Sequence, residues 1–92
     1  MKNKISIVIP FYNEEKILPH LFHRINTVTN DWEENWEVIC INDGSDDNTL
    51  EILYSFNQKV SCWKILSLSR NFGQQAAISA GLNFVSGDIF VL

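Results

Sequence analysis

Short apolar segments alternate with segments of helical periodicity along the whole chain. The strand-like runs are 5–10, 36–41, 60–67 and 88–92, and the helix-like runs between them are about 17–28, 50–56 and 74–85. Parallel strands need crossover helices and are buried on both faces, so this alternation predicts an α/β fold. We expect a βαβαβαβ parallel sheet with helices on both faces. The 92 residues are enough for one domain and too few for two.

Polar residues follow each of the first three strand-like runs, where a strand gives way to a helix. These turns are 10–15, 42–49 and 70–73. In an open parallel sheet the carboxyl ends of the strands lie at one edge, and ligands bind there. We therefore expect the three turns to form one binding site.

The turn that begins at Asp43 is the most specific candidate within this site. An aspartate at the end of a central strand can accept a hydrogen bond from a base N–H or a ribose hydroxyl. Gly44 would let the backbone approach such a ligand closely. Asp46, Asp47 and Asn48 favour a plainer interpretation as caps of the following helix, because Asp and Asn are common N-cap residues.

The other two turns leave several interpretations open. Tyr12 can lie against a base or a ribose, whereas Glu14 can equally favour a helix N-terminus through the helix dipole. Arg70 is the one cation in the three turns. It can meet a phosphate, or pair with Asp43 or Asp47.

Composition and motifs exclude several classes of function. Seven basic residues against eleven acidic ones give a net charge of −4, which does not suit a nucleic-acid-binding surface. The G-x-G-x-x-G, Walker and G-x-S-x-G motifs do not occur in the sequence. A receiver or an electron carrier with a flavodoxin-like fold would need an acidic cluster with a lysine, or a flavin loop. The sequence shows neither, so this class is not supported. Because the chain is acidic, the phosphates of a ligand would need backbone N–H groups, helix N-termini or a metal ion.

No metal site is expected within the chain. His20 and His23 lie one helical turn apart, but no third ligand accompanies them, so we interpret them as exposed. Cys40 and Cys62 fall in apolar runs and are interpreted as small buried residues. The run 5–10 is too short for a signal peptide or a membrane span.

Three motifs in combination resemble the family 2 glycosyltransferases. They are V-I-P-F-Y-N-E-E at 8–15, N-D-G-S-x-D-x-T at 42–49 and R-N-F-G-x-x-x-A at 70–77. Within that family they are most similar to the polyprenyl-phosphate branch, which includes dolichol-phosphate-mannose-synthase-like and bactoprenol glucosyltransferases. The resemblance implies a GT-A (Rossmann-like) domain that binds a UDP- or GDP-linked sugar across the carboxyl edge of its sheet. It also implies polyprenyl phosphate as the acceptor, and a role in cell-envelope polysaccharide or glycolipid biosynthesis.

The resemblance also assigns roles to individual residues. Asp43 would contact the base, and Asn42 stands where many members carry a second aspartate and others of this branch carry Asn. The expected nucleotide-sugar-binding residues are Pro10, Tyr12, Glu14, Asp43, Arg70, Asn71 and Gly73.

Family members place a D-x-D motif directly after the strand that ends here at Leu92, and its carboxylates hold Mg²⁺ or Mn²⁺. A later acidic residue acts as the base. Neither lies in this sequence, so 1–92 are expected to be the N-terminal nucleotide-sugar-binding portion, truncated before the metal motif and inactive alone. The full-length enzyme would work in the cytoplasm or at the cytoplasmic face of a membrane, with membrane association through other regions. The alternative is a non-catalytic nucleotide-binding fragment or module.

Overall fold

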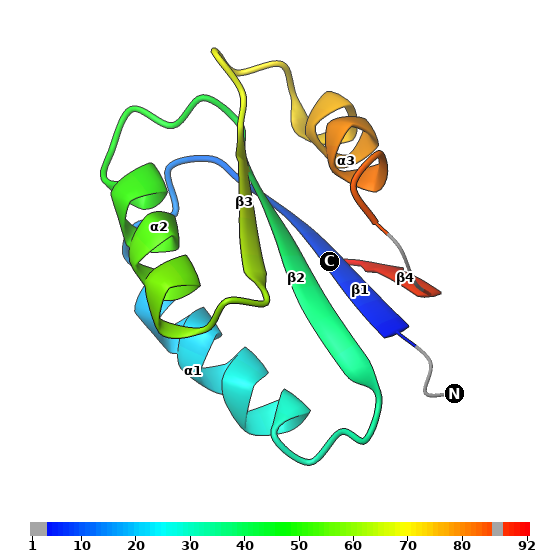
Figure 1. Cartoon of the computed structure of the whole chain (residues 1–92). Coiled ribbons are helices and arrows are strands. Elements are labelled where there is room, and N and C mark those ends of the chain that lie inside the picture. The colour runs from blue at the N-terminus through cyan, green and yellow to red at the C-terminus, as the bar shows by residue number, and fades with distance from the viewer. Residues whose placement is uncertain (1–3, 86–87) are drawn as a thin grey trace.

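The computed structural model describes residues 4–85 and 88–92 as a four-stranded parallel sheet with three helices (Figure 1). The strand order is β3-β2-β1-β4, and every neighbouring pair is parallel. The predicted α/β class and the βαβαβαβ order are confirmed. The elements are β1 (Lys4–Phe11), α1 (Leu18–Thr29), β2 (Asn35–Asn42), α2 (Thr49–Lys59), β3 (Trp63–Ser67), α3 (Gln74–Leu82) and β4 (Asp88–Val91).

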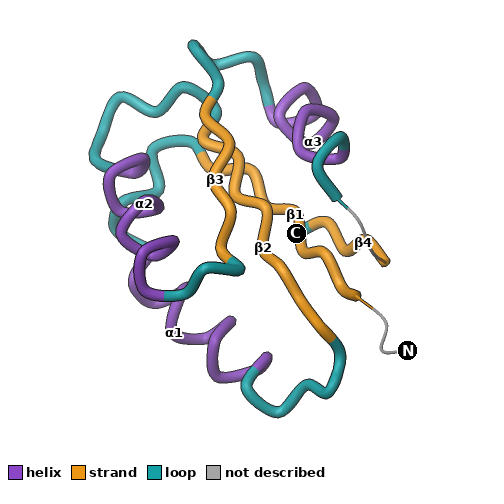
Figure 2. The backbone as a smooth tube through the Cα atoms, viewed as in Figure 1, coloured by secondary structure: helices purple, strands orange, loops and turns teal. Residues whose placement is uncertain are grey.

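Helices cover both faces of the sheet, as predicted. Figure 2 shows α1 and α2 together on one side of the sheet and α3 on the other. Side chains of a strand point alternately to the two faces, so Ile7 and Ile9 pack in the cluster that includes Leu18 of α1 and Phe56 of α2. Val8, between them, packs in the second cluster, which includes Ala77 of α3.

Small residues on α3 let this helix lie close to the sheet. Ala77 and Gly81 are its buried residues. A Cβ on Gly81 would come within 2.5 Å of Cδ1 of Ile41 on β2. The small residues of α3 therefore set the distance between this helix and the sheet.

Several predicted ends of elements differ from the structure, among them the end of α2, which is Lys59 instead of residue 56. The third strand begins at Trp63 instead of residue 60, because the Val60 N–H donates to the carbonyl of Phe56 at 2.8 Å and so closes α2. The third helix ends at Leu82 instead of residue 85. Beyond it, the Phe84 N–H donates to Gly81 O at 3.0 Å, a tighter three-residue turn.

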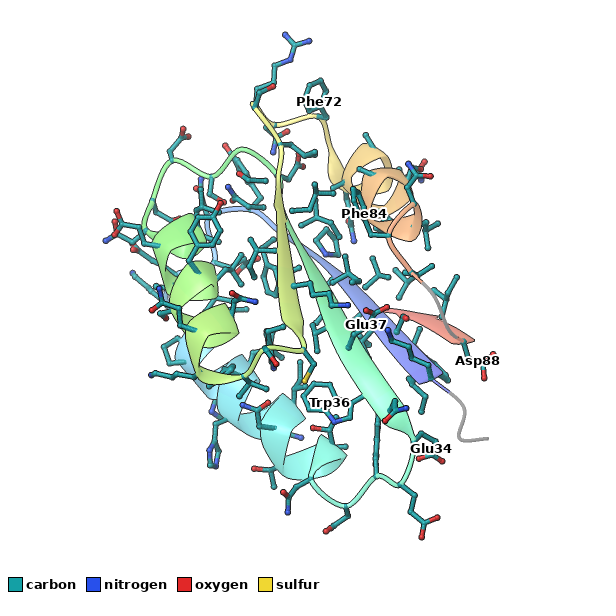
Figure 3. All side chains as sticks on the ribbon, in the orientation of Figure 1. Glu34, Trp36, Glu37, Phe72, Phe84 and Asp88 are labelled. Atoms are coloured by element: carbon teal, nitrogen blue, oxygen red, sulfur yellow. The ribbon has the colours of Figure 1, made fainter. Side chains whose placement is uncertain are left out.

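A buried carboxylate lies in the middle of the sheet, on the α3 side. Figure 3 labels this residue, Glu37 of β2. It is 1% exposed. The Ser6 hydroxyl of β1 donates to its Oε2 at 2.6 Å, and Lys64 Nζ of β3 donates to its Oε1 at 2.7 Å. Lys4 Nζ lies 3.4 Å from the same Oε1. The carboxylate therefore joins the three strands β1, β2 and β3 through their side chains.

Acid should destabilise the protein through Glu37. Burial raises the pKa of this carboxyl, but hydrogen bonds from Lys64 and Ser6 and the charges of Lys64 and Lys4 outweigh it and lower the pKa from 4.5 to about 2. The stabilisation is therefore complete above about pH 4.5 and is lost as the pH falls toward 2. Between about pH 6 and pH 3 the loss should be about 2 kcal/mol.

Urea denaturation at these two pH values measures that loss. In Glu37→Gln the fall in stability should be smaller by about 2 kcal/mol, because the titrating group is gone. Glu34→Gln, which changes an exposed glutamate just before β2 (Figure 3), should behave like the wild type. Equal pH dependence in wild type and Glu37→Gln would contradict the assignment.

Candidate functional site

A polar cleft of about 500 Å³ lies at the carboxyl edge of the sheet. Its walls come from the end of β1, the turn after β2, the loop that leads into α3 and the residue after β4. The structure thus brings the three polar turns together at one edge. The lining residues are Pro10, Phe11, Tyr12, Glu14, Asp43, Asn71, Gly73, Gln74 and Leu92.

Six of the seven expected site residues line this cleft, and Arg70 is the exception. Its guanidinium carbon lies 4.8 Å from the centroid of the exposed Phe72 ring. Arg70 lines a neighbouring polar hollow of about 430 Å³ on the β3 side of the turns. Among the described residues it forms no ion pair with Asp43 or Asp47. Arg70 therefore contacts the aromatic ring of Phe72 instead of pairing with an aspartate.

Asp43 has a structural role that the sequence did not reveal. Asp43 is 3% exposed, and its two carboxylate oxygens accept the N–H groups of Phe72 at 2.8 Å and Gly73 at 3.1 Å. The Asn71 side-chain amide also donates to the Asp43 carbonyl at 3.3 Å. Hydrogen bonds to an ionised acceptor are stronger than neutral ones. Asp43 therefore fixes the third turn while it also lines the cleft.

Gly44 is required where the second turn packs against the third. Its φ is +67°, which favours glycine, and a Cβ there would lie 2.2 Å from the carbonyl carbon of Arg70 and 2.3 Å from the nitrogen of Asn71. The backbone that Gly44 approaches is therefore the third turn. The expectation that Gly44 also lets the backbone approach a ligand stays a prediction.

The first and second turns are also joined directly. The Asn13 N–H donates to the Ser45 hydroxyl at 3.0 Å, and the Asp46 N–H donates to Asn13 Oδ1 at 2.7 Å. Asn13 has a φ of +53°, in the left-handed region that Asn tolerates better than most residues. Sequence reasoning missed both Asn13 and Ser45, although an Asn in a turn between a strand and a helix is a signal for this conformation.

Capping of α2 differs in part from the expectation. Asn48 occupies the N-cap position but makes no side-chain capping bond. Asp47 instead accepts the N–H of Thr49, the first residue of the helix, at 2.9 Å. Partial burial raises the pKa of Asp47, but the hydrogen bonds from Thr49 and from the Glu15 N–H outweigh it, so this pKa is below its usual range.

The described residues do not provide a metal site. In the ranges 4–85 and 88–92, no three His, Cys, Asp or Glu side chains gather closely enough to hold an ion. His20 and His23 are exposed, as expected. Cys40 is buried and Cys62 is half-buried, and both are free thiols. Of the helices in the described part of the chain, none has the length and apolar character needed to cross a membrane.

The model of the glycosyl transferase family 2 matches residues 6–92 of this chain. The chain belongs to glycosyltransferase family 2. Family membership agrees with the three motifs at the carboxyl edge. The motifs therefore identified the family correctly from sequence.

Two curated relatives of the family align along almost the entire chain. An uncharacterised glycosyltransferase of Synechocystis sp. is 45% identical over 99% of this chain and 29% of its own length. The undecaprenyl-phosphate 4-deoxy-4-formamido-L-arabinose transferase of Salmonella choleraesuis is 42% identical over 96% of this chain and 27% of its own. The chain therefore spans less than a third of the length of these relatives.

Solved structures show the same fold. S. aureus TarS 1–349 superposes on the whole chain with a TM-score of 0.80 and 27% identity, over 27% of its own length. TarS has also been solved with UDP and with UDP-GlcNAc. The mannosyltransferase PcManGT of Pyrobaculum calidifontis, solved with GDP-Man and Mn²⁺, has a TM-score of 0.75 at 17% identity, covering 95% of this chain and 26% of its own. The expected GT-A fold is confirmed.

Proposed function

We propose that residues 1–92 are the N-terminal nucleotide-sugar-binding portion of a glycosyltransferase that moves a sugar from a nucleotide diphosphate to an acceptor. The observation that carries this proposal is the cleft in which Tyr12, Glu14, Asp43 and Asn71 meet at the carboxyl edge of the sheet. Ligands of open α/β sheets bind at that edge. The UDP and UDP-GlcNAc complexes of TarS support a nucleotide-sugar as the ligand.

The chemistry of the cleft suits the nucleoside half of such a donor. The carboxylates of Asp43 and Glu14 can accept hydrogen bonds from a base N–H or from ribose hydroxyls. Tyr12, 44% exposed, offers a ring face to a base or a ribose. Asn71 and Gly73 belong to the third turn, and Pro10 lines the cleft at the end of β1. These residues are compatible with either uracil or guanine.

The diphosphate half needs positive charge that the cleft does not supply. The described residues that line it include no Lys or Arg, and Arg70 lies in the neighbouring hollow. Backbone N–H groups at the start of α3, beside Gln74, are the nearest anion-binding feature. Arg70 would join the site only by turning away from Phe72.

The Mg²⁺ or Mn²⁺ that we propose for the complete enzyme does not fit the described residues, because they hold no cluster of metal-ligating side chains. We assign its ligands, and the catalytic base, to positions other than 1–92. No step of the reaction is assigned to a metal held by this chain. The Mn²⁺ in the PcManGT structure supports a divalent metal in this fold.

The proposed acceptor is a polyprenyl phosphate. The support is the Salmonella relative, an undecaprenyl-phosphate sugar transferase by name, which aligns over 96% of this chain. With such an acceptor, the reaction would take place at the cytoplasmic face of a membrane and contribute to cell-envelope glycolipids. The alternative function, a nucleotide-binding module without transfer activity, would use the same cleft. Sugar transfer by a longer protein that contains this chain would distinguish the two functions.

Titration with UDP and GDP, followed by amide NMR, tests the binding site. We expect chemical-shift changes at Tyr12, Glu14, Asp43 and Asn71, because these residues line the cleft. Amides of residues at the opposite end of the strands, such as Trp36, should not move. If neither nucleotide shifts the cleft amides at a concentration of several millimolar, or if the shifts lie elsewhere, the proposed site is wrong.

A further inference from the structure

We propose that Thr49 and Asp47 are positioning residues of the nucleotide site. They hold the first turn against the second, and with it Tyr12 and Glu14. This inference rests on the proposed function, because it gives these two residues, which do not line the cleft themselves, a role in positioning the residues that do. Sequence reasoning interpreted Asp47 as a helix cap or as a partner of Arg70.

The hydroxyl of Thr49 ties α2 to the turn after β1. Thr49 is fully buried, and its Oγ1 accepts the N–H of Glu14 at 2.9 Å. The same hydroxyl donates its proton to Asp47 Oδ1. A hydroxyl has one proton to donate and lone pairs to accept, so Thr49 uses both functions at once. A residue without a hydroxyl at this position would leave the Glu14 N–H without its partner.

Asp47 holds the next residue of the first turn, Glu15. Its Oδ1 accepts from the backbone and hydroxyl of Thr49, and its Oδ2 accepts the N–H of Glu15 at 3.3 Å. In return, the Asn48 N–H donates to Glu15 Oε2 at 3.2 Å. Two consecutive backbone N–H groups of the first turn are thus held by side chains more than thirty residues away in the sequence.

These bonds matter because the first turn lies outside regular structure. α1 begins only at Leu18, after Ile17 as its N-cap. Glu14 contributes to that helix start through its carbonyl, which accepts from the N–H groups of Ile17 and Leu18. Its own N–H points instead to Thr49. The placement of Glu14, a cleft residue, is therefore set by α2.

A turn that is already ordered makes ligand binding tighter, because the ligand then does not have to order it. Loss of the hydrogen bonds from Thr49 and Asp47 to the first turn would make the segment around Tyr12 and Glu14 less ordered. A nucleotide would then have to restore their arrangement opposite Asp43. Ordering even a single residue costs roughly the free energy of a tenfold change in affinity. We therefore expect about a tenfold weaker affinity for a nucleotide.

The test compares two identical substitutions. Thr49→Val removes the hydroxyl of the tie with little change in shape. Thr29→Val removes another buried threonine hydroxyl, which donates to Ile25 O at 2.8 Å at the far end of α1, roughly 16 Å along the helix from its start. UDP affinity and amide hydrogen exchange at Glu14 are measured in both variants. Thr49→Ser, which retains the hydroxyl, serves as the rescue.

We expect Thr49→Val to bind UDP about tenfold more weakly and to exchange the Glu14 amide at least tenfold faster. Thr29→Val and Thr49→Ser should stay within about twofold of the wild type in both measurements. UDP affinity within twofold of wild type in Thr49→Val would overturn the proposal. Equal weakening by both Val variants would also overturn it, since a global loss of stability would then explain the effect.

Two further outcomes are separable. If the wild type binds no UDP, the proposed function fails, and hydrogen exchange at the Glu14 amide alone tests whether Thr49 holds the first turn. Unchanged exchange in Thr49→Val overturns that role, and faster exchange supports it. If Thr49→Val does not fold, Asp47→Asn takes its place. This variant keeps one acceptor oxygen for Thr49 and loses the acceptor for the Glu15 N–H, so Glu15 should exchange faster and UDP should bind more weakly.

Discussion

Gly44→Ala should be destabilised by about 4 kcal/mol, which is a large fraction of the stability of a domain of this size. The added Cβ would lie 2.2 Å from the carbonyl carbon of Arg70 and 2.3 Å from the nitrogen of Asn71. Both atoms belong to backbone, so the third turn itself would have to move. Alanine would also have to adopt the φ of +67° found at this position. Urea denaturation followed by circular dichroism measures the loss.

Gly73→Ala is the matched control for this prediction. Gly73 also has a positive φ, of +100°, but nothing lies within 4 Å of a Cβ built there. Only backbone strain is expected, and it should cost about 2 kcal/mol. If Gly44→Ala were no less stable than Gly73→Ala, the close contact between the second and third turns would not be the reason for the glycine.

Asp43→Asn should lose at least tenfold in UDP affinity and about 2 kcal/mol in stability. The carboxylate accepts the N–H groups of Phe72 and Gly73, one on each oxygen. An asparagine has one acceptor oxygen, so its NH₂ group would face one of these donors at a site that is 3% exposed. The third turn would then shift, and Asn71 and Gly73 would move with it. Calorimetric titration with UDP and thermal denaturation measure the two effects.

Asp46→Asn provides the comparison within the same turn. Asp46 is exposed, and it joins the turn network through its backbone N–H, which donates to Asn13. Both properties should stay close to those of the wild type. A stable Asp43→Asn with unchanged UDP affinity would show that the two carboxylate bonds neither order the third turn nor contribute to the site.

Most of the fold could be predicted because burial follows periodicity. The apolar runs of β1 and β2 are buried on both faces, and that is why they read as continuous in the sequence. The ends of elements were less predictable. Val60 belongs to an apolar run, yet its N–H completes α2 before β3 starts. Hydrophobicity alone does not show to which acceptor a backbone N–H will donate.

The candidate site was predictable at the level of its turns. The rule that parallel strands end at one edge predicts that Tyr12, Asp43 and Asn71 lie close together, and all three line the cleft. The same rule could not place Arg70, whose long side chain lies over Phe72. Position along the backbone is set by the strand, but the direction of an exposed side chain depends on its local contacts.

The amino-acid pattern was enough to establish the α/β class, the strand-helix order, the family and the three turns at the edge of the sheet. The links between those turns came only from the folded arrangement. Asp43 reaches Phe72 and Gly73, and Thr49 reaches Glu14, across about thirty residues of sequence. Periodicity reports which side of a strand or helix is buried, and motifs report which residue types occur together. Hydrogen bonds between distant turns depend on strand register and on single backbone angles such as the φ of Gly44, and only packing of the whole domain determines those.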